Sequence, residues 1–208
     1  MPVAQSLVDF NASLTQCNSL IANAHMQDAN GNHLFPQQDR EQITVAAFLN
    51  MFIAWEGFLE AAIGNFMMGD ATLNGSQPIK FVTPPTQVHS TAMVIHIQRY
   101  FDFANHENVR KLVNLYFEKG YPFEVPIVSI NAELLDLKTI RNACAHISSS
   151  TSKALAALAI RILGQPQPNI TVHQMLTAID PREANGNTTV FAFYQAKLIS
   201  AATLIATG

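Results

Sequence analysis

Charged residues are scarce in this chain of 208 residues. Asp, Glu, Lys and Arg together make up 13% of it, and the formal net charge at pH 7 is −3. Proteins that bind nucleic acid through bulk electrostatics carry a strong positive charge, so this class is excluded. A nucleic acid would have to be held by a few local cations. Because 49% of the residues are hydrophobic, the chain can bury a large core, and we expect part of its apolar surface to be covered in an oligomer.

Cysteine is almost absent, and so are the common cofactor and hydrolase motifs. Cys17 and Cys144 have no second cysteine or histidine at metal-ligand spacing. On a helical projection Cys144 falls on the apolar side, which favours a core residue over a nucleophile. The Walker A, GxGxxG, GxSxG and HExxH patterns are missing. Nucleotide-driven, flavin, serine-hydrolase and zincin functions are therefore disfavoured, and we predict no cofactor and no metal.

Membrane and secretion signals are also weak. Residues 1–11 lack a basic region followed by an apolar stretch, so no secretory signal is expected. The longest apolar stretch, residues 45–68, contains Glu56 and Glu60. A carboxylate near the centre of a bilayer costs roughly 2.5 to 3.5 kcal/mol. We therefore expect a buried core helix, a cytoplasmic location and no membrane partner.

Prolines and glycines divide the chain into segments with the apolar spacing of helices, which predicts an all-α fold. Residues 188–194 favour a strand locally, although the residues after them favour a helix. No internal repeat or long linker is evident. The predicted helices cover residues 4–26, 39–68, 86–104, 107–119, 127–146, 153–163, 171–179 and 188–206.

Three polar side chains fall at the end of the predicted helix 127–146. Arg141 has a planar guanidinium that can hold a phosphate, His146 can exchange a proton near neutral pH, and Asn142 can orient either of them. At about 100° per residue, Asn142 and His146 form an i,i+4 pair that can hydrogen-bond, and Lys138 lies on the same polar strip. Metal-free RNA cleavage needs these groups. The spacing alone also fits a solvated helix face with an incidental ion pair.

The order Arg141-Asn142-x3-His146 resembles the Arg-x4-6-His motif of HEPN-superfamily ribonucleases, in which a polar residue, often Asn, directly follows the Arg. Residues 44–66, with an aromatic-Glu step at Trp55-Glu56, are similar to the first long core helix of these domains. The nearest resemblance is to prokaryotic RiboL-PSP-type proteins. It implies a HEPN-like helical bundle over residues 1–208, in which residues 69–126 form a helical insertion.

The resemblance also implies a function, a metal-independent endoribonuclease that acts as a toxin or host-defence effector. Arg141 would stabilise charge on the phosphate, His146 would transfer a proton and Asn142 would orient one of these groups. HEPN ribonucleases are usually symmetric dimers, so the implied partners are RNA, a second copy of the chain and a cognate antitoxin protein. Two alternatives stay open: a non-catalytic HEPN-like module that binds RNA, nucleotide or protein, and a helical scaffold without a ligand.

Two further residues are predicted to support the motif. Glu56 and Glu60 form an i,i+4 pair that lacks the Glu-x-x-His companions of a di-metal site. Since buried carboxylates need partners, we expect Glu56 to support a cation such as Arg141, with a purely structural pair as the alternative. Lys138 and Arg141 would form a basic patch if a second set of cations packs nearby, the alternative being scattered surface charges. That second set is Arg110, Lys111 and Lys119.

Other histidines offer competing sites. Arg99 and His106 also satisfy a loose Arg-x-His pattern, but Tyr100 follows the Arg, and residues 105–107 read as a junction between helices. A metal site at His89, His96 and His106 lacks a carboxylate or thiolate to complete a usual ligand set. The remaining histidines, His25, His33 and His173, have no evident partners in the sequence.

Overall fold

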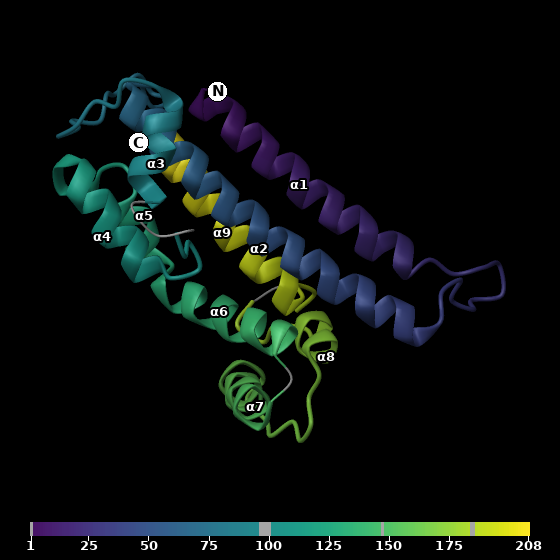
Figure 1. Cartoon of the computed structure of the whole chain (residues 1–208). Helices are drawn as coiled ribbons and strands as arrows, with labels where there is room; N and C mark the ends of the chain where they lie inside the picture. The colour runs from purple at the N-terminus through teal and green to yellow at the C-terminus, as the bar shows by residue number, and fades with distance from the viewer. Residues whose placement is uncertain (1, 96–100, 147, 184–185) are drawn as a thin grey trace. The chain divides into compact units, whose positions relative to one another are not determined.

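The computed structural model of the chain describes residues 2–95, 101–146, 148–183 and 186–208. Within these ranges the chain is helical, and β structure is limited to three isolated bridges, so the predicted all-α class is confirmed. The longer helices are α1 (Val3–Ala24), α2 (Gln37–Met68), α6 (Asn131–Ala145), α7 (Ser149–Leu163) and α9 (Val190–Thr207) (Figure 1). The shorter ones are α3 (Gln87–Ile95), α4 (His106–Tyr116), the 3-10 turn η1 (Glu118–Gly120), α5 (Glu124–Ser129) and α8 (Val172–Thr177).

The chain folds into two compact units. The first contains Met1–Ala12, Ala54–Leu134 and Lys197–Gly208, and the second contains Ser13–Ile53 and Leu135–Ala196. Residues 69–126, the predicted insertion, fall entirely within the first unit. Whether the chain is one HEPN-like domain with such an insertion stays a prediction.

Aromatic packing joins the first turns of α1 to the second half of α2 in the first unit. The ring of Phe10 lies 6.2 Å from that of Trp55 and 5.5 Å from that of Phe58, measured between centroids. Inside this apolar contact, Asn65 Nδ2 donates to Ser6 Oγ at 3.0 Å, so the buried amide is paired. Residues 45–68, which the sequence predicted to form a buried core helix, thus make both apolar and polar contacts with α1.

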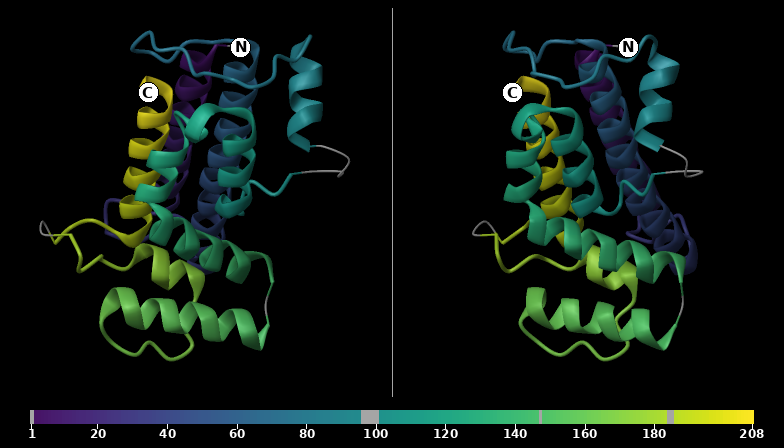
Figure 2. Two further views of the ribbon diagram at one scale, coloured as in Figure 1. Left: turned by 90° about the vertical axis from the view of Figure 1, so that its left-hand side faces the viewer. Right: turned by 60° about the vertical axis from the view of Figure 1, so that its left-hand side comes forward.

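Both chain ends of the first unit lie at the same end of it (Figure 2). The Val3 amide donates to the Asp70 carboxylate at 3.0 Å, and the Leu73 amide donates to the Ala206 carbonyl at 2.8 Å. The segment after α2 therefore fastens the beginning of α1 and the end of α9.

One helix boundary near Pro126 differs from the prediction. Residues 120–126 were expected to separate the predicted helices 107–119 and 127–146. Instead α5 begins at Glu124 and carries Pro126 in its first turn, where a missing N–H costs no helical hydrogen bond. Ile130, with φ −114° and ψ 24°, then separates α5 from α6. The predicted helix 127–146 is thus wrong at its start and correct from residue 131 onward.

Two other boundaries differ from the prediction. The helix expected over residues 86–104 is described as α3 to Ile95, residues 96–100 lie outside the described ranges, and residues 101–105 are not helical. The ambiguous start at residues 188–194 is helical from Val190, because Thr189 Oγ1 accepts from the Ala192 amide at 3.2 Å and caps the first turn.

The second unit is organised around capped helices. Ser148 and Thr151 form a reciprocal capping box at the start of α7, and Thr171 and Gln174 do the same for α8. The predicted helix 153–163 therefore begins four residues earlier, at Ser149, in the serine-rich stretch that follows the end of α6. The buried side of α7 is formed by Leu155, Leu158, Ala159 and Ile162.

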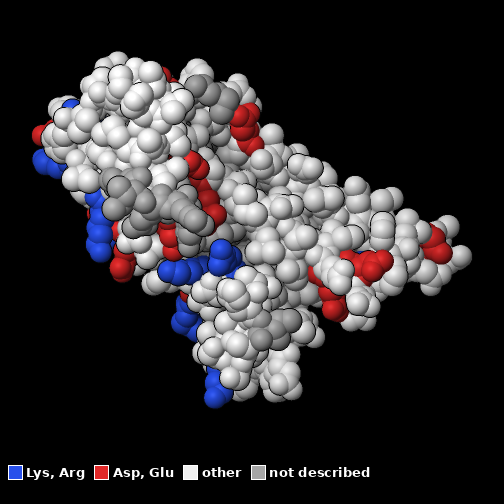
Figure 3. Space-filling view, in the orientation of Figure 1, with Lys and Arg blue, Asp and Glu red and all other residues white. Residues whose placement is uncertain are grey.

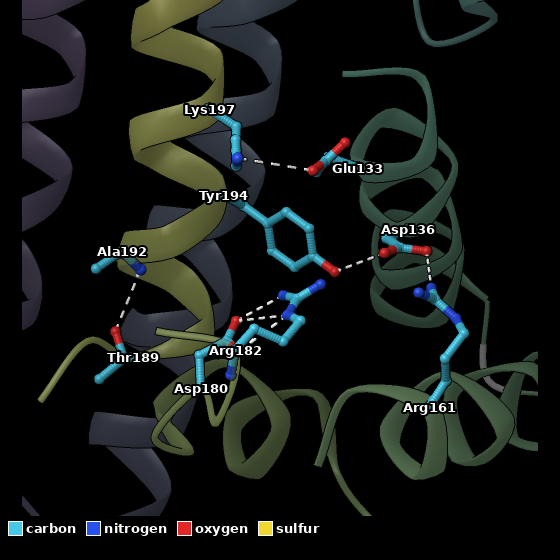
Figure 4. A network of polar contacts seen from close by, with 9 residues as sticks. All are labelled: Glu133, Asp136, Arg161, Asp180, Arg182, Thr189, Ala192, Tyr194 and Lys197. Carbon is cyan, nitrogen blue, oxygen red and sulfur yellow. Dashed lines mark hydrogen bonds and ion pairs between the residues drawn. The ribbon is translucent and has the colours of Figure 1, made fainter. Parts of the chain in front are cut away.

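A buried carboxylate, Asp136, ties three helices of the second unit together (Figure 4). Its Oδ2 accepts from the Tyr194 hydroxyl of α9 at 2.9 Å, and its Oδ1 pairs with the Arg161 guanidinium of α7. Burial raises the pKa of Asp136, although the bonds from Tyr194 and Arg161 oppose that rise. Tyr194 is fully buried, whereas the Arg161 side chain is 55% exposed, so the hydroxyl is the inner partner of this carboxylate.

A second buried pair lies beside the first. Asp180 is fully buried, and Arg182 donates to it from Nε at 2.8 Å and from Nη2 at 2.5 Å. Burial favours a higher pKa for Asp180, but the hydrogen bonds from the Arg182 side chain and backbone outweigh it and lower the pKa. The Arg182 guanidinium also lies 4.1 Å from the Phe193 ring centroid, which orients it over the start of α9.

The described helices include two that are long and apolar enough to cross a membrane, α2 and α9. Of the apolar stretch in each, 50% and 56% is buried inside the chain. A helix in a protein core meets the same criteria, so the cytoplasmic location stays a prediction.

Tyr194→Phe should lower the free energy of unfolding by about 1 to 3 kcal/mol at neutral pH, because Asp136 keeps its burial and loses its inner donor. The lost bond favours the charged carboxylate, so its removal raises the pKa of Asp136 further. The destabilisation should therefore be complete above the folded-state pKa of Asp136 and shrink as the carboxyl is protonated at lower pH. Denaturant unfolding across a pH series measures it. Tyr121→Phe is the matched control at an exposed tyrosine, with a change within about 0.5 kcal/mol. Equal losses in the two variants would contradict this account.

Candidate functional site

The three motif residues lie at the carboxyl end of α6 in the second unit. Arg141 and Asn142 are half-buried in the last turn of the helix, and His146 is exposed directly after it. The His146 amide still donates to the Asn142 carbonyl at 3.0 Å, so the helical hydrogen-bond pattern reaches His146. The sequence therefore placed the motif correctly on a helix end.

The side chain of Asn142 does not form the hydrogen bond to His146 that the helical projection predicted. Arg141 Nη1 lies 3.4 Å from Asn142 Oδ1 and donates to it, whereas the described residues contain no bond between the Asn142 amide and the His146 imidazole. Asn142 therefore contacts the guanidinium rather than the imidazole. The i,i+4 pairing of Asn142 and His146 exists in the backbone only.

The backbone of His146 is held by the helix that follows. Thr151 Oγ1 donates to the His146 carbonyl at 2.5 Å and belongs to the capping box that starts α7. An orphan carbonyl at the end of α6 is thereby satisfied by the first turn of α7. This contact fixes the main chain at His146 while its imidazole remains open to solvent.

Arg141 carries an uncompensated positive charge. No described carboxylate of the second unit lies within the 4.0 Å of an ion pair from its guanidinium, and Asn142 supplies only a neutral oxygen. Lys138, one turn earlier on α6, is half-buried. A half-buried arginine without a counter-ion is suited to hold an anion such as a phosphate.

The other predicted supports belong to the first unit. Glu56 is half-buried on α2, and its support of Arg141 stays a prediction. Arg110 is engaged with Glu124, to which its Nε donates at 2.9 Å, and the basic patch of Arg110, Lys111 and Lys119 with Lys138 and Arg141 also stays a prediction. Basic side chains on the face drawn in Figure 3 are separated by uncharged and acidic ones, in keeping with the low charged fraction.

Cys144 is one of the three residues between Asn142 and His146, and its thiol is unreactive. Burial raises the pKa of its thiol to about 11, although the backbone and the nearby Arg141 charge oppose that rise. At neutral pH the thiol is therefore protonated and is a poor nucleophile. This agrees with its predicted place on the apolar side of the helix.

A groove of about 530 Å³ opens between the end of α6 and the starts of α7 and α8. Thr151, Ser152, Lys153 and Thr171 line it together with Ala143, which sits between Asn142 and Cys144. Arg141 and His146 are not among the lining residues. The groove therefore adds a cation, Lys153, and hydroxyl-bearing residues near the motif helix. Sequence reasoning missed them because their closeness depends on how α7 and α8 fold back.

The competing sites have different environments. Arg99 and His96 lie outside the described residues, so those predictions are untested. His106 is buried at the first position of α4, whose cap is Asn105, so a helix begins within residues 105–107 as predicted, but no described helix ends there. His89 is exposed, and its Nδ1 lies 2.8 Å from Thr86 Oγ1. Among the described residues no group of three His, Cys, Asp or Glu side chains is placed to hold a metal ion.

One cluster was missed by the sequence. His25, His33 and His173 lie together in the second unit, with the His25 ring 6.1 Å from that of His33 and 6.2 Å from that of His173 between centroids. No local pattern signals this grouping, since His173 is far from the other two along the chain.

Comparison with protein-family models, with curated proteins and with solved structures finds no match for this chain. The candidate site therefore rests on its own residues and geometry.

Proposed function

We propose that this protein is a metal-independent endoribonuclease that cleaves RNA by transphosphorylation, with Arg141, Asn142 and His146 at its centre. The observation that carries the proposal is the pairing of an uncompensated, half-buried Arg141 with an exposed His146 on one helix end, in the order Arg-Asn-x3-His. An arginine free of carboxylates can hold a phosphate, and a solvent-open imidazole can exchange a proton.

In the proposed reaction the ribose 2′-oxygen attacks the adjacent phosphorus, and the bond from phosphorus to the 5′-oxygen breaks. A base takes the 2′-hydroxyl proton, and an acid delivers a proton to the leaving 5′-oxygen. Arg141 would neutralise the charge that builds on the non-bridging oxygens. Asn142, which accepts from Arg141 at 3.4 Å, would keep the guanidinium in place for that contact.

Each chain supplies a single motif histidine for two proton transfers. We propose that a two-fold dimer brings two copies of His146 and Arg141 to one phosphate, so that one imidazole is the base and the other the acid. The low charged fraction of the chain supports this, because an apolar surface gains from being covered. A toxin or defence role, with an antitoxin protein as partner, remains part of the same proposal.

A binding role without catalysis is the second candidate. It is favoured by the open state of His146, whose imidazole has no hydrogen-bond partner among the described residues and is therefore not oriented by its own chain. A HEPN-like module that grips RNA, nucleotide or a protein partner through Arg141 would need no oriented imidazole. Cleavage and binding assays on the same variants separate the two roles.

The first functional prediction is that the protein cleaves RNA in the presence of excess EDTA. Positive charge from Arg141 takes the place of a metal ion at the phosphate, so chelation should not change the rate. The products should end in 2′,3′-cyclic phosphate or its hydrolysis product, which mass spectrometry of the fragments identifies. Activity that disappears with EDTA and returns with a divalent ion would rule out the metal-free mechanism.

The next prediction concerns the residues. His146→Ala and Arg141→Ala should each lower the cleavage rate by about 100-fold or more, as loss of a proton-transfer or charge-stabilising group typically does. The cleavage rate of Arg141→Lys should lie between the rates of these variants and that of the parent, because lysine keeps the positive charge and lacks the planar guanidinium. Initial rates on a fluorescent RNA measure these changes.

His89→Ala is the matched control for His146, since both imidazoles are exposed, and it should leave the rate unchanged. Arg99→Ala should also change little. His106→Ala is a poorer control because His106 is buried and its loss would disturb packing. Binding that survives in His146→Ala, together with no cleavage by the parent chain, would favour the non-catalytic module.

The dimer gives a separate test. Sedimentation should show a two-chain species, and an excess of His146→Ala chains mixed with the parent protein should suppress activity per parent chain, because mixed dimers hold one imidazole instead of two. An excess of His89→Ala chains should have no such effect. Full activity in a monomer would disprove the shared site.

A further inference from the structure

Three histidines from separate parts of the chain meet in the second unit. His25 follows the end of α1, His33 is in the loop between α1 and α2, and His173 is in α8. The His33 ring stands at 83° to the His25 ring, edge to face, and the His173 ring is nearly parallel to it at 8°. His25 is thus the central ring and connects the loop to α8.

Several nitrogens of this cluster are buried and lack hydrogen-bond partners, although His33 itself is exposed. His25 Nε2, both ring nitrogens of His173 and Arg40 Nε are buried atoms without a hydrogen-bond partner among the described residues. Arg40 lies in the first turns of α2 and adds a permanent positive charge near His25. Buried polar atoms without partners are rare in folded proteins and usually mark a functional or strained place.

The carboxylates on the surrounding elements do not neutralise the cluster. Asp28 in the loop accepts from the backbone amides of Asn30 and Asn32 and from the Asn32 side chain. Glu41 of α2, which lines a shallow groove with His173, accepts from Gln37 Nε2 at 2.8 Å. Asp39 is exposed in the first turn of α2, and no ion pair joins it to the described cations.

A charged imidazole is therefore disfavoured inside the cluster. Burial lowers the pKa of His25, and Arg40, His173 and His33 lower it further through like-charge repulsion. A protonated His25 would face the permanent charge of Arg40, and its Nε2 is buried without a hydrogen-bond partner among the described residues. The closed arrangement therefore suits a neutral His25.

We propose that His25, packed between the rings of His33 and His173, is the proton-sensitive centre of a latch, which holds the loop of residues 25–36 against α8 at neutral pH and releases it in mildly acidic solution. This is independent of RNA cleavage. The direction follows from linkage: the opened loop binds protons more readily than the closed one, so protonation stabilises the open form. The contribution of His25 to the closed form is complete above its ordinary pKa of 6.5 and is lost as the pH falls through its lower, closed-state pKa.

Amide hydrogen exchange on the full chain tests the latch. The loop has two reporters, the Asp28 amide, which donates to the Asn32 carbonyl at 2.8 Å, and the Leu34 amide, which donates to the Met26 carbonyl at 3.0 Å. Between about pH 7.5 and about pH 5.5, the protection factors of these amides, corrected for intrinsic exchange, should fall up to about tenfold as His25 is protonated. Amides in the buried turns of α7 should keep their protection.

Two variants assign the effect. His25→Gln removes the central titrating group, so loop protection should vary less than about twofold over the same range. Arg40→Gln removes the fixed charge and should make the pH-dependent loss of loop protection smaller than in the parent chain, since the closed form then tolerates a protonated His25 better. His89→Gln, at an exposed histidine outside the cluster, should release the loop at the same pH as the parent chain.

Three results would overturn the latch. Equal loop protection at both pH values would show that the cluster does not sense protons, and an unchanged pH response in His25→Gln would show that another group does. Zn²⁺ that raises loop protection at neutral pH in the parent chain but not in His25→Gln would identify the cluster as a metal site instead. If His25→Gln fails to fold, the smaller pH response of Arg40→Gln and the titration of the His25 ring proton by NMR decide between these outcomes.

Discussion

The burial of the Asp136 carboxylate is the constraint on which the geometry of the candidate site depends. A carboxylate inside a protein needs donors, and these come from Tyr194 on α9 and Arg161 on α7. Because Asp136 must face both donors, α6 cannot rotate about its axis without breaking them. At about 100° per residue, that fixed rotation places Arg141 about 140° around the helix from Asp136 and His146 about 80° to the other side. The buried hydrogen bonds of Asp136 therefore set the direction in which the motif residues face.

Much of the helical framework could be predicted from the sequence, because apolar spacing and Gly or Pro boundaries are local signals. The end of α2 and the end of α7, where Gly164 adopts a left-handed φ of 72°, follow directly from them. Pro126 shows the limit of this approach. A proline ends a helix when it falls in the interior but is tolerated in the first turn, and only the position of α5 decides which applies.

The candidate site was predictable to a similar extent. Its place at a helix end follows from the sequence, whereas the partner of Asn142 does not, since Arg141 is the neighbouring residue and a helical projection keeps neighbours apart. The long, flexible side chain of Arg141 spans that separation, so that its Nη1 lies 3.4 Å from Asn142 Oδ1. The sequence could not predict the histidine cluster, or the groove lined by Thr151 and Thr171, for another reason. In both places α8 packs against residues that are distant in the sequence, which no local pattern encodes.

The chain holds the side chains of Arg141 and His146 to different degrees. Arg141 is half-buried, held by Asn142 and free of carboxylates, so its position and charge are set before any ligand arrives. The His146 main chain is fixed by Thr151, but its imidazole is oriented by no described residue. A histidine that transfers protons efficiently needs a defined tautomer and direction, which a hydrogen bond to its second nitrogen normally supplies. In the proposed ribonuclease that bond has to come from outside this single chain, either from the RNA or from the second copy. Catalysis would then begin only when the shared cleft is assembled around its substrate.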